Sequence, residues 1–449
     1  MPRRPEPDTA QGAAAAVTPT AAPLLQVHDL QVHYPLRGTF LHRLLGREAG
    51  EVRAVDGVSF EVARGEVLGL VGESGSGKTT LGRALLRLVE PTAGSIRLEG
   101  RELVGLSEGA FRPLRQRLQM VFQDPHASLS PGMNLLSAIG HPLVIHGLAR
   151  DRGELRQRVA QALERVGLVP VERFLTKYPG DLSGGQKQRA VLARAIILGP
   201  ELLVADEPVS MLDMSVRAKI LELMLELKAE LGLTYLYITH DLATAKFFCD
   251  RIAIMYLGRI VEIGPAQAIY QHPRHPYTQA LLRAVPEPDP SRGVARDLPR
   301  GEIPDAVSPP LGCSFHPRCA RAFEPCGWER RDVATMLESR WATMAEEDWR
   351  AERALVGDLG ALAEPGEVAR LVPGRDASTA DLLGFLQRLR REGADPFWQG
   401  VGELAVEDGA VTVRFAPAVD PGLVVDGPVE VACLLYGRTP HADHTVPDA

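Results

Sequence analysis

Residues 72–79 have the composition and spacing of a phosphate-binding loop, Gly-Glu-Ser-Gly-Ser-Gly-Lys-Thr. The loop follows an apolar run at 66–71, which predicts a strand, and opens a predicted helix at 80–88. Glycines let the backbone wrap closely around phosphate, and N–H groups at the start of a helix face the anion. Lys78 adds positive charge at the outer phosphates, and the Thr79 hydroxyl is a candidate Mg²⁺ ligand. The predicted phosphate-binding residues are Gly72, Glu73, Ser74, Gly75, Ser76, Gly77, Lys78, Thr79 and Thr80.

A second apolar run ends in two acids. Residues 202–205 read Leu-Leu-Val-Ala and are followed by Asp206 and Glu207. A buried strand that ends in an acid can place its carboxylate in a Mg²⁺ shell, and the next carboxylate can act on an attacking water. For an isolated pair, an acidic strand end that faces solvent is the common alternative. Beside a phosphate-binding loop, the pair instead predicts phosphoryl transfer to water.

These residues need a fold that brings the ends of several strands together. Short apolar runs at 25–30, 66–71, 202–205 and 234–238 alternate with helical segments, and runs of this kind suit strands buried on both faces. The last two runs are separated by a predicted helix with apolar residues at helical spacing and a terminal glycine. Its residues are Ile220, Leu223, Met224, Leu227, Leu231 and Gly232. The pattern predicts an α/β fold with a largely parallel sheet.

Four further motifs stand in order along the same part of the chain. Leu-Ser-Gly-Gly-Gln occupies 182–186, and Phe-Gln-Asp occupies 122–124. Ser-Met-Leu-Asp occupies 210–213, and Thr-His-Asp occupies 239–241. With the phosphate-binding loop and the two acids, they resemble the ATP-binding cassette (ABC) family of transport ATPases. The four are similar to its signature, Q-loop, D-loop and switch histidine respectively.

The resemblance implies a fold and a set of roles. The fold is a P-loop ATPase core over 24–268, with a mainly parallel sheet, an antiparallel β subdomain and a helical subdomain at about 124–190. In such a core Glu207 polarises the attacking water, His240 contacts the γ-phosphate and Gln123 contacts Mg²⁺ or water. The residues implied to hold Mg²⁺ are Thr79, Gln123 and Asp206. The signature and D-loop residues implied to bind ATP are Ser183, Gly184, Gly185, Gln186 and Asp213.

Two features extend the expected ATP site beyond the P-loop. Ser183 and the amides that follow it begin a predicted helix at 186–198, a second anion-binding terminus that the P-loop of the same chain does not need. The resemblance implies a head-to-tail pair of chains, with each ATP between one P-loop and the opposite signature, so that closure depends on the γ-phosphate. Tyr34, at the end of the first predicted strand, either stacks on adenine or packs in the core.

Length and composition exclude several classes. The chain has 449 residues, of which 45% are hydrophobic and 24% charged, so it is globular in composition and long enough for two or three units. Its net charge of −7 lacks the basic excess of a dedicated duplex-binding protein, and we expect no nucleic-acid partner. No apolar run approaches the ~18 residues of a membrane helix, and the run at 13–17 is too short for a secretion signal. We expect a protein at the cytoplasmic face of the cell membrane, bound peripherally.

Beyond about residue 268 the chain becomes rich in proline. His-Pro-Arg-His-Pro-Tyr at 272–277 and Gly-Cys-Ser-Phe-His-Pro-Arg-Cys at 312–319 resemble the C-terminal extension of oligopeptide and dipeptide importer ATPases, a subset that includes nickel importers. An insertion at 35–51 and the phrase at 54–60 resemble the second of the two unlike ATPases in such importers. The resemblance implies a heterodimer with another ABC ATPase beneath two permease subunits, fed by an extracytoplasmic substrate-binding protein.

The sequence divides into five predicted units: a disordered tail at 1–23, the ATPase core at 24–268, the extension at 269–330, an inserted small α+β region at 331–425 and a closing segment at 426–449. In the insertion, Ser378 with Asp381 resembles a capping box, and Gly393 ends the helix that follows. Apolar residues at 404–406 and 411–415 flank Asp-Gly and predict a hairpin. Nothing in the insertion carries recognisable chemistry.

Three cysteines lie close together in the extension. Cys313, Cys319 and Cys326 are separated by five and six residues, unlike the two-to-four spacing of most zinc knuckles, and four cysteines suit a [4Fe–4S] cluster better. The segment around Cys433 resembles the closing cysteine segment of the importer ATPases, which implies that Cys433 is the fourth ligand. Zinc and unligated buried thiols remain the alternatives. Cys249 stands alone and is expected in the core.

The sequence therefore predicts the ATP-hydrolysing subunit of an ABC importer for dipeptides or oligopeptides. One alternative keeps the same motor and changes the cargo to nickel or another small solute. A second is a soluble ABC protein that acts on ribosomes or DNA. Translation-type members carry two cassettes in one chain, and repair-type members interrupt the cassette with a long coiled coil. This chain has one cassette and neither feature.

Overall fold

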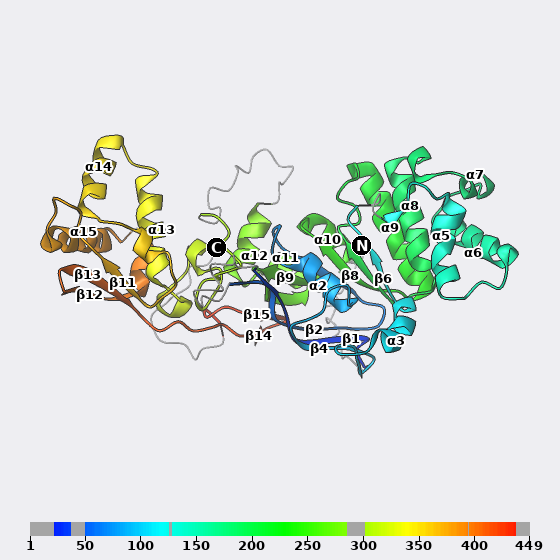
Figure 1. Cartoon of the computed structure of the whole chain (residues 1–449), viewed down its shortest axis with the longest axis horizontal. Helices are drawn as coiled ribbons and strands as arrows, with labels where there is room; N and C mark the ends of the chain where they lie inside the picture. Colours follow the sequence, from blue (N-terminus) through cyan, green and yellow to red (C-terminus); the bar gives the residue numbers. More distant parts are fainter. Residues whose placement is uncertain (1–21, 37–49, 125–127, 285–300, 394, 437–449) are drawn as a thin grey trace, which may run out of the picture.

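The structure is a computed structural model that describes residues 22–36, 50–124, 128–284, 301–393 and 395–436. Most of the predicted tail and of the insertion after Tyr34 lies outside these residues. The described chain is elongated, with the inserted region at one end, the helices of 135–196 at the other and two larger sheets between them (Figure 1). Within the described ranges, we find no helix that is both long and apolar enough to cross a membrane.

An eight-stranded sheet forms the core, in the order β14-β15-β10-β9-β3-β8-β7-β6. Its five parallel strands are β9 (Arg251–Tyr256), β3 (Val67–Val71), β8 (Thr234–Thr239), β7 (Leu202–Asp206) and β6 (Leu118–Val121). Every residue of β3, β7 and β8 is buried, as strands covered on both faces require. The antiparallel strands are β10 (Arg259–Pro265), β15 (Val429–Val431) and β14 (Val424–Asp426). The predicted α/β fold is confirmed.

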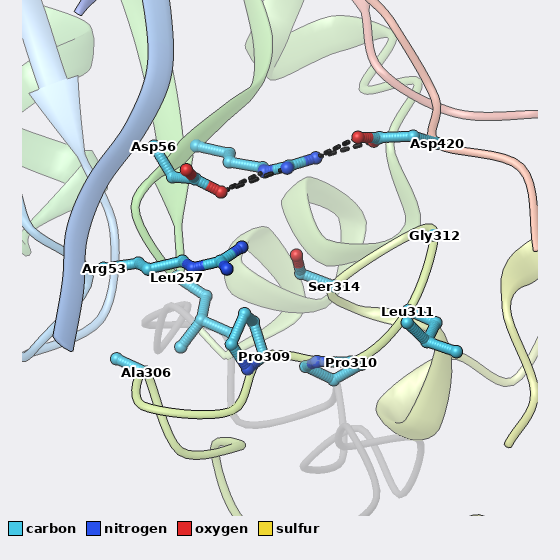
Figure 2. A pocket seen from close by; sticks show the side chains of 11 residues that line it. Arg53, Asp56, Leu257, Ala306, Pro309, Pro310, Leu311, Gly312, Ser314 and Asp420 are labelled. Atoms are coloured by element: carbon cyan, nitrogen blue, oxygen red, sulfur yellow. Dashed lines mark hydrogen bonds and ion pairs between the residues drawn. The ribbon is translucent and has the colours of Figure 1, made fainter. Parts of the chain in front are cut away.

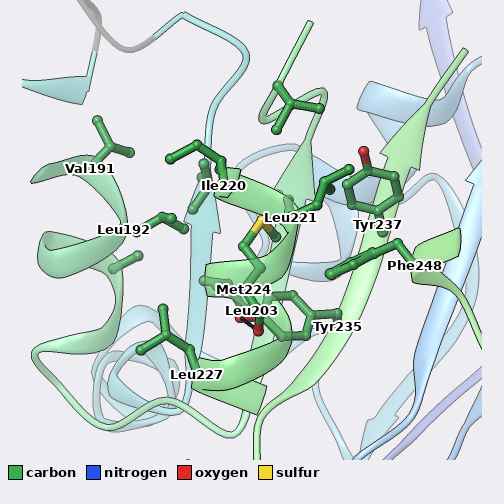
Figure 3. Packing of buried hydrophobic residues seen from close by; sticks show 14 of the residues in the cluster. Val191, Leu192, Leu203, Ile220, Leu221, Met224, Leu227, Tyr235, Tyr237 and Phe248 are labelled. Atoms are coloured by element: carbon green, nitrogen blue, oxygen red, sulfur yellow. Dashed lines mark hydrogen bonds between the residues drawn. The ribbon is translucent and has the colours of Figure 1, made fainter. Parts of the chain in front are cut away.

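Helices cover both faces of this sheet. The five that follow its strands are α2 (Lys78–Leu85), α9 (Met214–Leu231), α10 (Leu242–Phe248), α11 (Ala266–Gln271) and α12 (Pro276–Arg283). The apolar side of α9 packs between the sheet and α8 (Gly184–Ile196), and Figure 3 shows Met224 beside Leu203 and Tyr235. The helix ends at Gly232, whose φ of 65° is left-handed. The predicted helix at 80–88 ends early, because Arg87 is also left-handed.

A four-stranded antiparallel sheet packs against α2. Its order is β2-β1-β4-β5, with β1 (Leu25–Pro35), β2 (Glu51–Val62), β4 (Ala93–Leu98) and β5 (Arg101–Glu102). Its inward residues share one core with Leu81, Leu85 and the near face of β3. Two short helical turns follow, α3 (Glu108–Phe111) and η1 (Arg112–Gln116).

A helical region lies between β6 and β7. It contains α5 (Leu135–Ile145), α6 (Arg152–Arg165), α7 (Glu172–Leu175), the turn η2 (Pro179–Asp181) and α8. Asn134, Asp151 and Ser183 cap the three longer helices by accepting backbone N–H groups of the first turn. The apolar faces of these helices belong to the same buried cluster as the far face of the eight-stranded sheet. The region is therefore joined to the sheet by packing.

The proline-rich extension is more ordered than its composition predicts. The sequence predicts that regular structure gives way to loops beyond 268, yet α12 lies within this stretch. Pro276 occupies its first turn, where a missing N–H costs nothing, and the His275 ring accepts the N–H of Tyr277 at 3.1 Å. The pairing of β14 and β15 with β10 was also not predicted. Through that pairing, the closing segment continues the sheet of the ATPase core.

The inserted region has its own core and a three-stranded sheet in the order β11-β13-β12. The elements are α13 (Arg330–Trp341), α14 (Glu346–Leu355), η5 (Gly360–Leu362), β11 (Val368–Leu371), α15 (Thr379–Glu392), α16 (Phe397–Gly400), β12 (Val401–Glu407) and β13 (Ala410–Phe415). The capping box at Ser378 and Asp381 and the hairpin at 401–415 are both present. Cys326 and Trp328 belong to the same core, so it begins before residue 331.

A cavity of about 210 Å³ marks the junction of β2, β10 and the extension (Figure 2). Arg259 spans it and donates to Asp56 at 3.0 Å and to Asp420 at 2.6 and 2.8 Å. Asp420 lies between β13 and β14, so this one guanidinium joins the ATPase core to the segment that connects the inserted sheet to β14. Because Asp56 and Asp420 are already paired with Arg259, we assign no ligand to the cavity.

Candidate functional site

The P-loop passes so close to neighbouring backbone that glycine is required at two positions. Gly77 has a φ of 99°, and an added Cβ would lie 2.0 Å from the carbonyl oxygen of Ala54. At Gly72 an added Cβ would lie 2.1 Å from the carbonyl oxygen of Met255. Ser74 and Gly75 form the exposed tip of the loop, and Thr80 lies in the first turn of α2. The loop leads directly into the N-terminus of α2, where the N–H groups of a helix favour a bound phosphate.

Lys78 lies at the centre of the loop and is buried. Its ammonium donates to the carbonyl oxygens of Gly72 at 2.9 Å and Glu73 at 2.7 Å, and to the Ser76 hydroxyl at 3.2 Å. Burial lowers the pKa of Lys78, against the charges of Glu207, Asp206 and Glu73, which raise it. All three of its protons are held by the loop itself, so a phosphate must replace some of these partners when it binds.

The carboxyl end of β7 faces the P-loop. The Thr79 hydroxyl donates to Asp206 at 3.1 Å, and Asp206 is buried. Burial raises the pKa of Asp206, and the hydrogen bond from Thr79 opposes that rise. Mg²⁺ in nucleotide sites takes one or two carboxylates together with phosphate oxygens and waters, so this hydroxyl and this carboxylate fit it.

Glu207 is held by two side chains from other strands. The His240 Nδ1 lies 2.9 Å from one carboxylate oxygen, and the Gln123 amide donates to the other at 3.2 Å. The backbone of Glu207 is left-handed, with a φ of 46°, a conformation that costs a non-glycine residue energy and occurs mainly at functional sites. The structure therefore brings together Glu207, His240 and Gln123, the three residues predicted to be catalytic.

The signature residues lie apart from this cluster. Ser183 and Gly184 are exposed, and Ser183 forms a capping box with Gln186 at the start of α8. Gly185 packs against Val216 so closely that an added Cβ would lie 2.7 Å from a methyl group. Within the described chain, the hydrogen bonds of Ser183 go to its own helix and none reaches the P-loop. The start of α8 is thus a formed helix terminus open to solvent.

Two more predicted site residues lie outside the P-loop cluster. Asp213 caps α9 by accepting the N–H of Val216 at 3.0 Å. Tyr34 lies near the end of β1 opposite Val52, and 40% of its surface is exposed. An exposed ring is open to stacking on a base, whereas a core aromatic would be covered.

Three hydrogen bonds around Glu73 were not predicted from the sequence. The Arg318 guanidinium donates to the Glu73 carboxylate at 2.8 and 3.2 Å, and the Glu73 N–H donates to the Tyr277 hydroxyl at 3.0 Å. Both partners come from the extension, in α12 and in the turn η3 (His316–Arg318). The only sequence signal was that both residues stand in segments that resemble the importer extension.

The four cysteines of the extension and the closing segment line a single small cavity, and all are reduced: Cys313, Cys319, Cys326 and Cys433. Cys326 ends the turn η4 (Glu324–Cys326). Burial raises the pKa of Cys433 to about 11 and that of Cys319 to about 12. Among the residues that the structure describes, no three His, Cys, Asp or Glu side chains are grouped to hold a metal ion. Cys249 is buried in the core, as expected.

Comparisons with known proteins match two parts of the chain. Residues 55–210 match the family described as ABC transporter, and 261–326 match the family described as oligopeptide/dipeptide transporter, C-terminal region. The oligopeptide transport ATP-binding protein AppF of Bacillus subtilis is 45% identical over 306 residues, which cover 68% of this chain and 91% of that protein. A protein of Brucella ovis named for peptide import ATP binding is 47% identical over 307 residues, covering 68% and 92%. A solved dimeric ABC transporter cassette has 28% identity and a TM-score of 0.47, covering 54% of this chain and 98% of that one.

Proposed function

Because this chain belongs to the family of ABC transporter ATP-binding proteins, we propose that it is the ATP-hydrolysing subunit of an importer for dipeptides or oligopeptides. One observation supports this function above the others. An assembled P-loop site and an oligopeptide-type C-terminal region lie in the same chain. The match to this chain covers almost the whole length of the two relatives, whose names refer to peptide import and oligopeptide transport.

In the proposed mechanism Glu207 acts on the attacking water. Its carboxylate accepts a proton as the water oxygen attacks the γ-phosphorus, and ADP leaves with the pair of electrons from the broken bond. His240 and Gln123 hold that carboxylate in place, and His240 is exposed enough to reach a γ-phosphate. Thr79 and Asp206 would hold Mg²⁺, which offsets charge on the phosphate oxygens when it is bound with ATP.

The exposed signature supports a site shared between two chains. The start of α8 presents free N–H groups and the positive end of the helix dipole, which suit the phosphates of a nucleotide bound elsewhere. In the proposed pair, Ser183, Gly184 and Gly185 contact the ATP on the P-loop of a second ABC ATPase. Asp213, at the start of the neighbouring helix, lies beside that contact.

The proposed assembly follows from this pairing. A second, unlike ATPase completes the pair, two permease subunits lie above it in the membrane, and an extracytoplasmic binding protein delivers the peptide. The chain would then sit at the cytoplasmic face of the membrane as a peripheral subunit. The relatives' names support a membrane transporter, and the resemblance to the second ATPase of such importers supports the heterodimer.

Purification of the complex from detergent-solubilised membranes tests this function. We expect two permeases and one further cassette protein to co-purify, and the ATPase rate of the reconstituted complex to rise with a binding protein loaded with short peptides. A rate that responds to Ni²⁺-loaded binding protein and not to peptide would favour the alternative cargo. Ribosomes or DNA in place of permeases would contradict the transporter function.

We also propose that the cavity lined by the four cysteines is the site of a [4Fe–4S] cluster. Each iron of such a cluster binds one cysteine thiolate, so the four sulfurs do not have to converge on one metal ion. Four cysteines that line one cavity therefore suit a cluster. The N–H groups of Arg321 and Phe323 lie 3.4 Å from the sulfurs of Cys319 and Cys326, and such donors favour thiolate. The cluster would supply positive iron charge that compensates buried thiolates.

Analysis of anaerobically purified protein tests the cluster. We expect about four iron and four sulfide per chain, lost in Cys326→Ser and kept in the control Cys249→Ser, whose thiol lies in the ATPase core. Stoichiometric zinc without sulfide would support the zinc alternative. Protein with neither metal nor sulfide would contradict both and leave four reduced thiols.

A further inference from the structure

The extension is hydrogen-bonded to the P-loop at Glu73, whose N–H, carbonyl oxygen and carboxylate all have partners. Its N–H donates to the Tyr277 hydroxyl at 3.0 Å, and its carbonyl oxygen accepts from Lys78 at 2.7 Å. Its carboxylate accepts two hydrogen bonds from the Arg318 guanidinium, at 2.8 and 3.2 Å. The position of this loop residue is thus fixed from outside the loop by the extension and from inside it by the phosphate-binding lysine.

Arg318 itself is held rigidly. Its side chain is 9% exposed, and its guanidinium lies 5.8 Å from the ring centres of both Tyr256 and Phe315. The guanidinium also donates to the Tyr256 hydroxyl at 3.4 Å. Tyr256, Phe315 and Tyr277 pack against one another, with ring centres 4.7 to 5.3 Å apart. An arginine clamped among aromatic rings keeps its fork in one orientation, which suits a two-point bond to a carboxylate.

We infer that Arg318 is a positioning residue of the ATP site. It fixes the start of the P-loop and offsets the charge of Glu73, a carboxylate that would otherwise repel the triphosphate. This inference rests on the proposed role of the P-loop in binding ATP. The C-terminal extension is then part of the nucleotide site, although it supplies no atom that touches ATP.

The electrostatic part of this role follows from the position of Glu73. Its charge is close enough to Lys78 to raise the pKa of that lysine, and ATP brings several negative charges to the same lysine. Glu73 is only partly buried, but the low dielectric of the surrounding protein keeps its field significant at the phosphates. Removal of Arg318 leaves this carboxylate unpaired beside the incoming phosphates.

Binding of a fluorescent ATP analogue to the full-length chain tests the inference. We expect Arg318→Met to weaken binding about 10-fold, and Arg318→Lys to weaken it less, since the charge remains and the fork is lost. Glu73→Gln is the second change in the test, because it removes the carboxylate that Arg318 pairs with. Combined with Arg318→Met, it should bring affinity back to within about threefold of the natural chain, because the unpaired charge is gone. A residue with only a structural role would show no such rescue.

Two controls separate the possible failures. Arg331→Met removes an arginine at the start of α13 that bonds to Ser308 and Glu329 of the extension, so ATP binding should be unchanged. Lys78→Ala should abolish binding, and normal binding in that variant would contradict the proposed ATP site itself. If Lys78→Ala does not bind the ATP analogue, the ATP site stands and Arg318 can be judged separately. Its role would then be contradicted by unchanged affinity in Arg318→Met, or by a double variant in which Glu73→Gln does not restore affinity. If Arg318→Met fails to fold, the Arg318→Lys variant and the double variant decide the question by the same comparison.

Discussion

The P-loop region and the signature region are both built for phosphate, but they differ in how far one chain completes them. At the P-loop, Lys78 bonds to the loop itself, Asp206 accepts from Thr79 of α2, and Glu207 contacts His240, which follows β8. At the signature, Ser183 forms a capping box with Gln186 of its own helix, and Ser183 and Gly184 face solvent.

The difference shows how the catalytic work is divided. The parallel sheet places the ends of β3, β7 and β8 side by side, so the residues proposed to hydrolyse ATP assemble within one chain. The helical region that carries the signature is packed on the far face of that sheet and brings its own anion-binding terminus. In the proposed account, one chain binds a nucleotide at its own P-loop, and its signature contacts the nucleotide of another chain.

The largest effect is expected at Glu207. Glu207→Gln should lower the rate of ATP hydrolysis about 10² to 10⁴-fold, because an amide cannot accept the proton of the attacking water. Binding of ATP should be unchanged, since the phosphates are held by the P-loop. Steady-state ATPase assays measure the rate, with Glu222→Gln on the exposed side of α9 as the matched control. Near-normal turnover in Glu207→Gln would remove this residue from the role.

Ser183→Asp sharpens the comparison by changing only the signature. Aspartate caps a helix as well as serine does and suits the helix dipole, so α8 should remain folded. Its negative charge beside the partner's triphosphate should reduce hydrolysis by the assembled complex at least about 10²-fold, the scale of an unscreened charge pair of about 3 kcal/mol. The isolated chain should bind ATP normally. Weakened binding by the isolated chain would place the signature at its own nucleotide.

A smaller effect is expected at Tyr34. Loss of base stacking in Tyr34→Ala should weaken ATP binding by about 1 to 3 kcal/mol, and Tyr34→Phe should restore it. Thermal unfolding of the same variants distinguishes stacking from core packing. A large drop in melting temperature with no change in ATP affinity would show that the ring belongs to the core.

The smallest effect on catalysis is expected in the inserted region. Leu386→Ala opens a cavity in its separate core, and large-to-small changes of this kind cost about 2 to 5 kcal/mol. Because none of the proposed catalytic residues lies in that core, the ATPase rate at low temperature should stay within about twofold. Calorimetry measures the stability. A matching loss of ATPase activity at a temperature where the protein is folded would show that the insertion acts on the ATP site.

Local signals in the sequence were enough to predict the ATP-binding part of the fold. Buried strands have the predicted continuous apolar runs, and the helix end predicted at Gly232 and the helix start predicted at Ser183 are both present in the structure. Glu207 and His240 were also predictable, because each follows an apolar run that the sequence displays, whereas Gln123 was predicted from the resemblance of 122–124 to the Q-loop motif. Such features depend on periodicity and on residues a few positions apart, which a sequence displays directly.

The contacts between distant segments were not predictable in this way. Arg318 meets Glu73 across 245 positions, and the closing strands join β10 across more than 160. A short segment such as 429–431 has no periodicity of its own, and its place in the sheet is decided by the edge it finds. Helix α12 was missed because proline ordinarily signals a loop, while Pro276 stands in a first turn that tolerates it.

The most direct test of the two-chain site is the ATPase rate per chain measured over a dilution series, with sedimentation of the same samples. We predict negligible hydrolysis where only the single chain sediments, and a rate that rises with the fraction of paired chains or with an added second ATPase subunit. The full rate of the transporter, reached at a dilution where every chain is single, would contradict the account.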